Sequence, residues 1–241
     1  YYLDGGEPPG RWWGDAAHDL GLEGTVTPQS LKNLLVGRHP NGKPLVQNAG
    51  APRRRPGFDL TFSAPKSVSV LWAVADEQTR RAIQEAHHAA VAEALRFLQD
   101  TAAYVRRGKG GVTRVPATLA VAMFEHGTSR ALEPQLHTHA LVMNVARGED
   151  GRFGAVDGRD LFRTKMTAGA AYRAELSAQL ERSLGLECVP KKSWFELKGV
   201  PEKLMKTFSS RRGAIELELK SVALETASAA ALATLKTRPV K

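Results

Sequence analysis

Three closely spaced histidines are the residues of this sequence best suited to chemistry. His137 and His139 lie one residue apart in an apolar run from 135 to 144 that is typical of a β-strand. Side chains at positions i and i+2 of a strand point to the same face, so both imidazoles would project from one surface. His126 follows a second apolar run, residues 119–124. If the two runs pair as neighbouring strands, three imidazoles converge, as in a catalytic metal site that keeps open coordination positions.

The same histidines also have an ordinary interpretation. A single histidine in a strand is usually a half-buried polar residue, and a His-x-His pair can arise by chance. The third histidine and the connection Thr128-Ser129-Arg130 to Pro134-Gln135 favour the metal site. These residues alone select neither the metal nor the reaction.

Composition restricts the classes of protein that remain. The chain has 241 residues, which fits one large domain or two small ones, and its 42% hydrophobic content is enough for a real core. Its 34 Lys and Arg against 25 Asp and Glu give a net charge of +9, which favours an anionic partner, nucleic acid first. The other interpretation is a protein that merely carries excess arginine.

Several other features can be read directly from the chain. Cys188 is the only cysteine, which rules out an internal disulfide and a thiolate metal cluster. No apolar run reaches about 18 residues and no signal peptide is present, so we expect no membrane insertion. Because the chain begins with Tyr1 rather than methionine, we expect the natural protein to extend beyond both ends.

The elements that must position the histidines are strands joined mainly by hairpins. Residues 57–62 alternate, with Phe58, Leu60 and Phe62 on one face and Asp59 and Thr61 on the other. Further strands are expected at 104–107, 112–116, 119–124, 135–144, 153–156, 187–189 and 194–197. This order predicts an antiparallel α+β sheet rather than parallel crossovers.

Helices are expected between these strands. Thr27 and Asp76 are expected to cap two of them, and Ser63 to cap a third that opens at residues 64–66. The helix after Asp76 carries His87 and His88, which we interpret as surface or boundary residues. Longer helices are expected at 160–184, 201–212 and 214–236, whereas residues 1–14, rich in Gly and Pro, are expected to form a loop.

Three stretches of the chain resemble one known family. They are Tyr1-Tyr2 ahead of Arg11-Trp12-Trp13-Gly14, the run Phe58-Asp59-Leu60-Thr61-Phe62-Ser63-Ala64-Pro65-Lys66-Ser67-Val68-Ser69, and His126-Gly127-Thr128-Ser129-Arg130 through Pro134-Gln135-Leu136-His137-Thr138-His139. Together they resemble the conjugative relaxases of the MobF (TrwC/TraI-like) class, tyrosine nucleases of the HUH endonuclease superfamily. The last two motifs are long and unusual, and the likeness runs from the first residue to about Arg212.

The resemblance implies a fold and an activity. The fold is α+β, a five-stranded antiparallel sheet flanked by helices, with C-terminal helical fingers that clamp DNA. Residues 1–200 would form the catalytic core, and residues 201–241 the fingers region of the same domain. The activity is site- and strand-specific nicking and rejoining of single-stranded DNA at an origin of transfer, through a covalent 5′-phosphotyrosine intermediate. Family members often carry a helicase further along the chain.

The resemblance also assigns roles to residues. Tyr1, the first of the pair, would be the nucleophile, with Tyr2 as the alternative. His126, His137 and His139 would hold a divalent ion (Mg, Mn or Zn) that polarises the scissile phosphate. Asp59 would either hydrogen-bond a ligand histidine and fix its tautomer or accept the tyrosine proton.

A larger set of basic residues is expected to contact DNA phosphates: Arg53, Arg54, Arg55, Lys66, Arg106, Arg107, Lys109, Arg130, Lys191, Lys192, Arg211 and Arg212. Trp12 and Trp13 could stack on a base or pin their loop to the body. The implied partners are hairpin and single-stranded DNA at the origin, relaxosome accessory proteins and a type IV secretion coupling protein. The implied location is the bacterial cytoplasm, with export alongside DNA to the recipient cell.

Two other functions stay open on the sequence alone. One is a three-histidine metal-dependent hydrolase of a small substrate, which needs a water-activating acid but no tyrosine and leaves no protein–DNA adduct. The other is a catalytically idle DNA-binding module.

Overall fold

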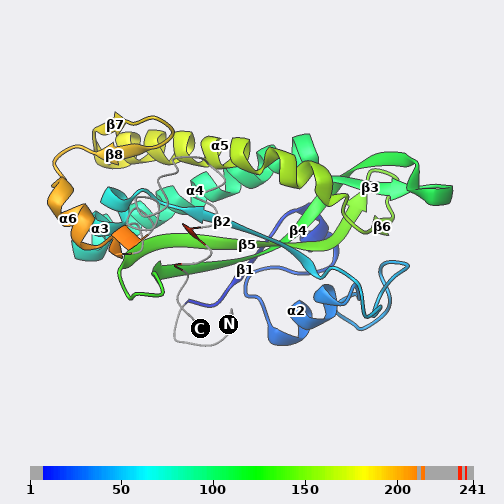
Figure 1. Cartoon of the computed structure of the whole chain (residues 1–241). Coiled ribbons are helices and arrows are strands. Elements are labelled where there is room, and N and C mark those ends of the chain that lie inside the picture. The colour runs from blue at the N-terminus through cyan, green and yellow to red at the C-terminus, as the bar shows by residue number, and fades with distance from the viewer. Residues whose placement is uncertain (1–7, 211–212, 215–232, 235–236, 238–241) are drawn as a thin grey trace.

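A long antiparallel sheet forms the centre of the molecule. The computed structural model describes residues 8–210, 213–214, 233–234 and 237. The main strand order is β1 (Arg11–Trp13), β4 (Thr113–Thr128), β5 (Pro134–Gly148) and β2 (Gly57–Ser63), all antiparallel (Figure 1). Two further strands extend it, because β3 (Tyr104–Arg107) pairs with β4 and β6 (Phe153–Gly154) pairs with β5.

Helices cover both faces of this sheet. On one face lie α3 (Lys66–Val74), α4 (Glu77–Ala102) and α5 (Gly158–Leu184), and on the other α1 (Asp15–Asp19) and α2 (Pro28–Leu35) (Figure 1). A small hairpin of β7 (Cys188–Pro190) and β8 (Phe195–Leu197) leads to α6 (Glu202–Thr207). The predicted α+β fold with a helix-flanked antiparallel sheet is therefore confirmed. Over the described residues the sheet has six strands, not the five that the resemblance implied.

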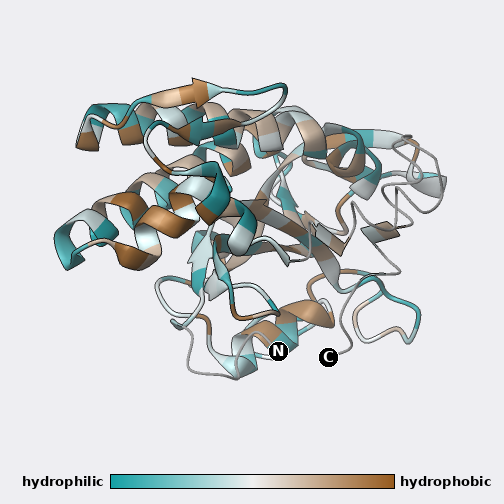
Figure 2. Cartoon of the chain, turned by 60° about the vertical axis from the view of Figure 1, so that its left-hand side comes forward, coloured by the Kyte–Doolittle hydropathy of each residue, from teal (hydrophilic) through white to brown (hydrophobic). Residues whose placement is uncertain are grey.

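The two faces of β4 and β5 belong to two hydrophobic cores. Val121, Ala140 and Val142 pack against α4 and α5, which we call the helix face of the sheet. Ala122 and Met143 pack toward α1 and α2 on the opposite face. Both faces are buried, so these strands read as nearly continuous apolar runs. Figure 2 shows this, with hydrophobic residues in the central strands and mixed hydrophobic and hydrophilic residues along the helices.

Several predicted boundaries need correction. Residues 11–13 form β1 rather than a loop, and 113–128 form one strand rather than two. Helix α3 begins at Lys66 after Pro65, with no side-chain cap, because Ser63 belongs to β2. The helix predicted at 201–212 is the shorter α6, and most of 214–236, with the predicted fingers, lies outside the described residues. Asp76 and Thr27 do cap α4 and α2, as predicted, by accepting the N–H of Thr79 and Ser30.

Gly14, between β1 and α1, provides a test of this packing. Its φ is +101°, and a Cβ there would lie 2.2 Å from the carbonyl oxygen of Leu119 in β4. We expect Gly14→Ala to lower the free energy of unfolding by about 2–4 kcal/mol, since an unfavourable φ is combined with a backbone clash. Thermal unfolding measures this. Gly21→Ala is the matched control, because Gly21 has φ +68° but no atom within 4 Å of the added Cβ. Equal effects of the two substitutions would contradict the packing argument.

Candidate functional site

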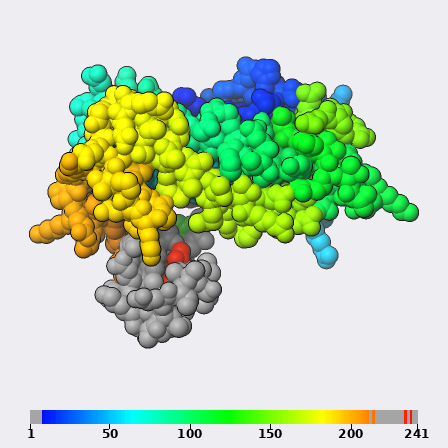
Figure 3. All heavy atoms as spheres, turned by 90° about the horizontal axis from the view of Figure 1, so that it is seen from above, coloured from blue at the N-terminus to red at the C-terminus, as the bar shows by residue number. Residues whose placement is uncertain are grey.

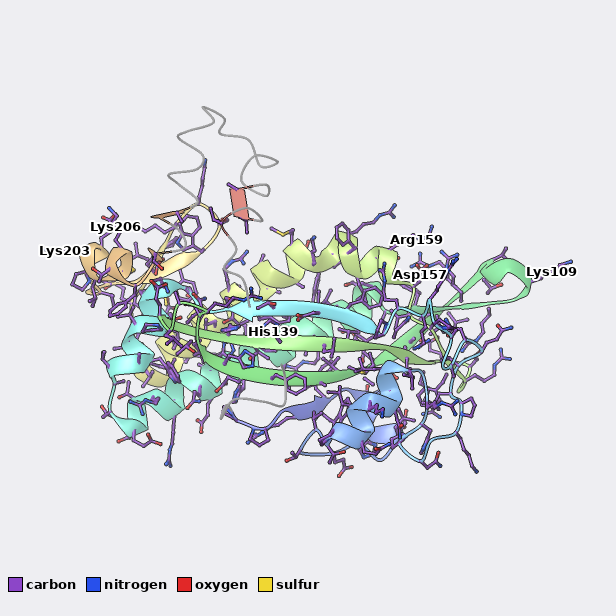
Figure 4. The ribbon with its side chains drawn as sticks, turned by 60° about the horizontal axis from the view of Figure 1, so that its bottom comes forward. Lys109, His139, Asp157, Arg159, Lys203 and Lys206 are labelled. Atoms are coloured by element: carbon purple, nitrogen blue, oxygen red, sulfur yellow. The ribbon has the colours of Figure 1, made fainter. Side chains whose placement is uncertain are left out.

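The three histidines converge on one face of the β4–β5 hairpin, as their spacing predicts. His126 and His137 are directly opposite in the register, and His139 is two residues further along β5 on the same face. Every pair of imidazole centroids is 5.2 Å apart, and one nitrogen from each ring lies within 4.8 Å of the other two. His126 and His137 are buried, whereas His139 is partly open to solvent. Figure 4 shows His139 on the sheet, between the two ends of the molecule.

Two of the rings are oriented by hydrogen-bond acceptors that lie next to their Nδ1 atoms. The Nδ1 atom of His139 is 3.0 and 3.1 Å from the carboxylate oxygens of Asp59 on β2. The Thr61 hydroxyl, directly opposite His139 in the register, is 3.3 Å from the same nitrogen. His137 Nδ1 lies 2.7 Å from the carbonyl oxygen of Gln135. When Nδ1 donates to these acceptors, Nε2 carries the lone pair that a metal ion needs.

Electrostatics favour the same protonation state for His137. Burial lowers the pKa of its imidazole, and this effect outweighs the opposing hydrogen bond to Gln135. A lowered pKa keeps the ring neutral near pH 7, which is the form that binds metals. Three imidazole nitrogen donors, two of them oriented by hydrogen bonds, therefore fit a divalent cation of the Zn, Mn or Mg type better than a structural polar cluster.

His87 lies in the core and corrects the expectation of a surface or boundary residue. It is 0% exposed, and its two ring nitrogens contact the hydroxyls of Tyr172 and Thr138 at 2.7 and 2.8 Å. Thr138 is the residue between His137 and His139, so this contact reaches the strand that carries two of the three histidines. His88 is exposed and hydrogen-bonds Glu125.

Of the basic residues near the β3–β4 turn, Arg106 and Lys109 are exposed and Arg107 is half-buried, and both arginines are engaged with carboxylates. Lys109 sits at the tip of this turn, which projects from one end of the molecule (green in Figure 3, labelled in Figure 4). The Arg106 guanidinium donates to Asp157 at 3.0 Å, and that of Arg107 to Asp150 at 2.8 and 3.0 Å. The hydrogen bonds to Asp150 raise the pKa of Arg107. A phosphate at Arg106 or Arg107 would have to compete with these carboxylates.

Two of the predicted phosphate contacts, Arg54 and Lys66, are partners of the backbone of β5. Arg54 is buried, donating to the Asn48 side chain at 2.6 Å and to the Asn144 carbonyl, so it attaches the 37–56 loop to β5. Its guanidinium is already engaged by these two acceptors, and its contact with DNA stays a prediction. Lys66 is half-buried and donates to the carbonyl of Pro134 at 2.9 Å, at the start of β5, and burial lowers its pKa.

The remaining basic candidates are distributed over the surface. Arg53, Arg55, Arg130, Lys191 and Lys192 are exposed. No described contact joins Arg53, Arg55, Lys191 or Lys192 to the histidines, and DNA binding by all five residues stays a prediction. Arg211 and Arg212 lie outside the described residues.

Tyr1 and Tyr2 also lie outside the described residues, so their catalytic roles stay predictions. Arg11 pairs with Met123, and Gly10 packs against the ring of Phe124. These described residues place β1 against β4, the strand that carries His126.

The two tryptophans of β1 pack into the body of the protein, which supports the pinning role over base stacking. Trp12 is 8% exposed and belongs to the core that faces α1 and α2. Trp13 is half-buried and packs against the other core. Among the helices of the described residues, none is both long and apolar enough to span a bilayer.

Comparison with known proteins finds relatives that match this chain along nearly all of its length. The TrwC relaxase family model matches residues 1–241. The chain is 36% identical over 243 residues to the multifunctional conjugation protein TraI of Escherichia coli (strain K12), covering 95% of this chain and 13% of TraI. Conjugative relaxase TrwC in complex with OriT DNA, in a metal-free and a metal-bound structure, has a TM-score of 0.88 and 31% identity over 100% of this chain and 86% of TrwC. The chain thus spans only a small part of the TraI relatives it matches.

Proposed function

Because this chain belongs to the TrwC relaxase family, we propose that it nicks and rejoins one DNA strand at an origin of transfer. The single observation that carries the proposal is the convergence of His126, His137 and His139, with Asp59 against His139, inside a fold shared with an OriT-bound relaxase. We propose that residues 1–200 form the catalytic core and that residues 201–241 add the DNA-clamping fingers.

The proposed reaction is a transesterification at phosphorus. The phenolic oxygen of Tyr1 attacks the scissile phosphorus, forming a Tyr–O–P bond while the bond from phosphorus to the 3′ oxygen breaks. The phenol loses its proton and the leaving 3′ oxygen gains one. A divalent ion bound by the three histidines would supply Lewis-acid charge to a non-bridging oxygen of that phosphate. Because the phosphoester is retained on the protein, the 3′ hydroxyl can reverse the reaction and rejoin the strand.

We assign Asp59 to orientation rather than to proton transfer. Its carboxylate lies within hydrogen-bonding distance of the Nδ1 atom of His139, and Thr61 lies at the same nitrogen. A carboxylate in this position fixes the imidazole tautomer and ring plane of a metal ligand.

The proposed partners extend beyond the DNA. The substrate is single-stranded DNA with an adjacent hairpin at the origin, as in the OriT complexes of TrwC. We also propose relaxosome accessory proteins, a type IV secretion coupling protein, and action in the bacterial cytoplasm followed by export with the DNA. The net charge of +9 supports the nucleic-acid partner.

The proposal is tested with a labelled single-stranded oligonucleotide that carries the cognate origin, incubated with divalent metal and run on a denaturing gel. We expect a slowly migrating protein–DNA adduct that disappears with a chelator. DNA binding without an adduct would favour the idle binding module. Metal-dependent hydrolysis of a small ester or phosphate, without any adduct, would favour the hydrolase.

Removing the Asp59 carboxylate should weaken the metal centre without unfolding the chain. We expect Asp59→Asn to lower metal affinity and nicking about 10- to 100-fold, the usual cost of losing an outer partner of a metal ligand. Metal titration and single-turnover nicking measure the two effects. Asp100→Asn, which neutralises an exposed carboxylate on α4, is the control. Unchanged metal affinity in Asp59→Asn would contradict the orienting role.

Contacts to several phosphates should make DNA binding strongly salt-dependent. We expect a steep linear fall of log K with log salt, with Lys109→Ala reducing the slope by about one phosphate equivalent. Fluorescence anisotropy at a series of salt concentrations measures the slope. Lys198→Ala is the control, since Lys198 is already paired with Glu187 at 2.7 Å. A flat salt response of the unaltered chain would contradict an extended basic interface.

A further inference from the structure

A polar cluster lies on the helix face of the sheet, directly behind the three histidines. The residues that alternate with them along β4 and β5 are Glu125, before His126, and Thr138, between His137 and His139. Glu125 and Thr138 are opposite each other in the β4–β5 register. They therefore share the strand segment of the histidines but point to the other side.

Thr138 is held by a buried chain of hydrogen bonds. Its hydroxyl lies 2.8 Å from Nε2 of His87 on α4, and Nδ1 of His87 lies 2.7 Å from the hydroxyl of Tyr172 on α5. Thr138, His87 and Tyr172 are 2%, 0% and 1% exposed. Burial lowers the pKa of His87 to about 3, so the ring is neutral, with one N–H donor and one acceptor nitrogen. Either hydroxyl can act as donor or acceptor, so both ring nitrogens are satisfied.

Glu125 is held from the same helix. Its carboxylate accepts a hydrogen bond from Gln84 Nε2 at 2.8 Å and is also bonded to His88. Gln84, His87 and His88 are at positions i, i+3 and i+4 of α4, so they line one side of the helix. One turn of α4 thus contacts both strands that carry histidines.

From these contacts we propose that the Glu125–Thr138 pair and its partners on α4 and α5 are positioning residues for the metal centre. Through Thr138 and Glu125 they fix the relative placement of the strand segments that present His126, His137 and His139. This inference rests on the metal centre of the proposed function.

The alternative is a polar cluster that only contributes to folding. Neighbouring positions on the helix face of both strands are apolar: Val121, Leu136, Ala140 and Val142. Apolar side chains would fill this space without the desolvation that buried hydroxyls and a carboxylate require. Hydrogen bonds require particular distances and angles between their partners, whereas apolar contacts are non-directional and allow the packed elements to shift. The polar residues of this cluster lie in the strand segments behind the histidines. We therefore infer that their hydrogen bonds fix the positions of these segments of β4 and β5 relative to each other.

The experiment titrates the full chain with Co²⁺ and follows the visible spectrum of the bound ion. We expect Thr138→Val and Tyr172→Phe each to weaken Co²⁺ binding about 3- to 10-fold, less than the 10- to 100-fold cost of losing a direct partner of a ligand. Thr138→Ser, which keeps the hydroxyl, should bind within about 2-fold of the unaltered chain. Ser67→Ala is the matched control, because the Ser67 hydroxyl is buried and accepts the N–H of Leu197 at 2.8 Å, a residue of β8 rather than of the histidine strands.

Melting temperatures without metal separate positioning from folding. A purely structural role predicts lower melting temperatures with unchanged Co²⁺ affinity, and this result would overturn the inference. Tyr172→Phe removes only the hydroxyl oxygen and keeps the ring, so we expect this variant to fold. It can therefore decide the test even if Thr138→Val does not fold. If the unaltered chain does not bind Co²⁺, the metal centre itself is refuted, and the proposed function falls with it. If the unaltered chain binds Co²⁺ and all variants bind equally, only the positioning role is refuted.

Discussion

A Tyr1→Phe chain is expected to form no covalent adduct with origin DNA. Phenylalanine keeps the ring but lacks the oxygen that forms the bond to phosphorus, and no water-dependent step can replace a protein–DNA linkage. Loss of a catalytic nucleophile usually costs about 10⁴-fold or more in rate. The adduct is measured on a denaturing gel with labelled single-stranded DNA, and DNA affinity is measured in parallel by anisotropy, where we expect little change.

Tyr2→Phe is the matched control for this experiment, since it removes the same atom one residue away. We expect Tyr2→Phe to retain the adduct. The opposite pattern, with the adduct lost in Tyr2→Phe and kept in Tyr1→Phe, would keep the metal site and move the nucleophile by one position. Retention of the adduct in both single variants and in the double variant would refute the tyrosine mechanism at this end of the chain.

The second large effect is expected from His137→Ala. This substitution removes one of three nitrogen donors from the centre of the cluster, where His137 is opposite His126 and shares β5 with His139. Charge stabilisation by a bound metal contributes several kcal/mol to a transition state, so we expect nicking to fall about 10³-fold. Single-turnover nicking at saturating DNA measures the rate. Chelation of the metal from the unaltered chain should give a comparable loss.

Measuring DNA affinity alongside nicking distinguishes a loss of catalysis from a loss of DNA binding in the His137→Ala chain. Because the exposed basic residues lie outside the histidine cluster, we expect His137→Ala to bind DNA within about threefold of the unaltered chain. His18→Ala changes an exposed histidine on α1 and should leave both nicking and binding intact. Full nicking activity in His137→Ala would exclude the three-histidine centre from the reaction.

The core of the candidate site was predictable because two local rules determine it. Alternation along a strand places His137 and His139 on one face, and pairing of the two apolar runs brings His126 opposite His137. The same alternation correctly separated Asp59 and Thr61 from the apolar face of β2. These rules depend only on neighbours in sequence and on one strand pairing, so tertiary packing did not change the result.

The predictions that failed depend on packing between distant segments. Residues 11–13 looked like part of a loop because Gly and Pro surround them, yet their pairing with β4 makes them a strand. The burial of Arg54 could not be predicted either, because it depends on hydrogen bonds to Asn48 and to Asn144, which is 90 residues away in sequence.

His87 was a different kind of error, because a sequence signal did exist. It lies four residues after Ile83 and three before Ala90, at the helical spacing of the buried side of α4. Its polarity suggested a surface or boundary position. The partners that permit its burial, Thr138 and Tyr172, come from elements more than 50 residues away.

All three histidines belong to one β-hairpin, and this has a consequence for how the metal centre forms. His126 and His139 are only 13 positions apart along the chain, so bringing them together closes a short loop at a small entropic cost. Short-range contacts of this kind form early when a chain folds. A chain that had been unfolded would bring all three nitrogen donors together once the β4–β5 hairpin re-formed, and an ion bound there would favour the folded state, in which Asp59 and the partners on α4 and α5 add to its affinity.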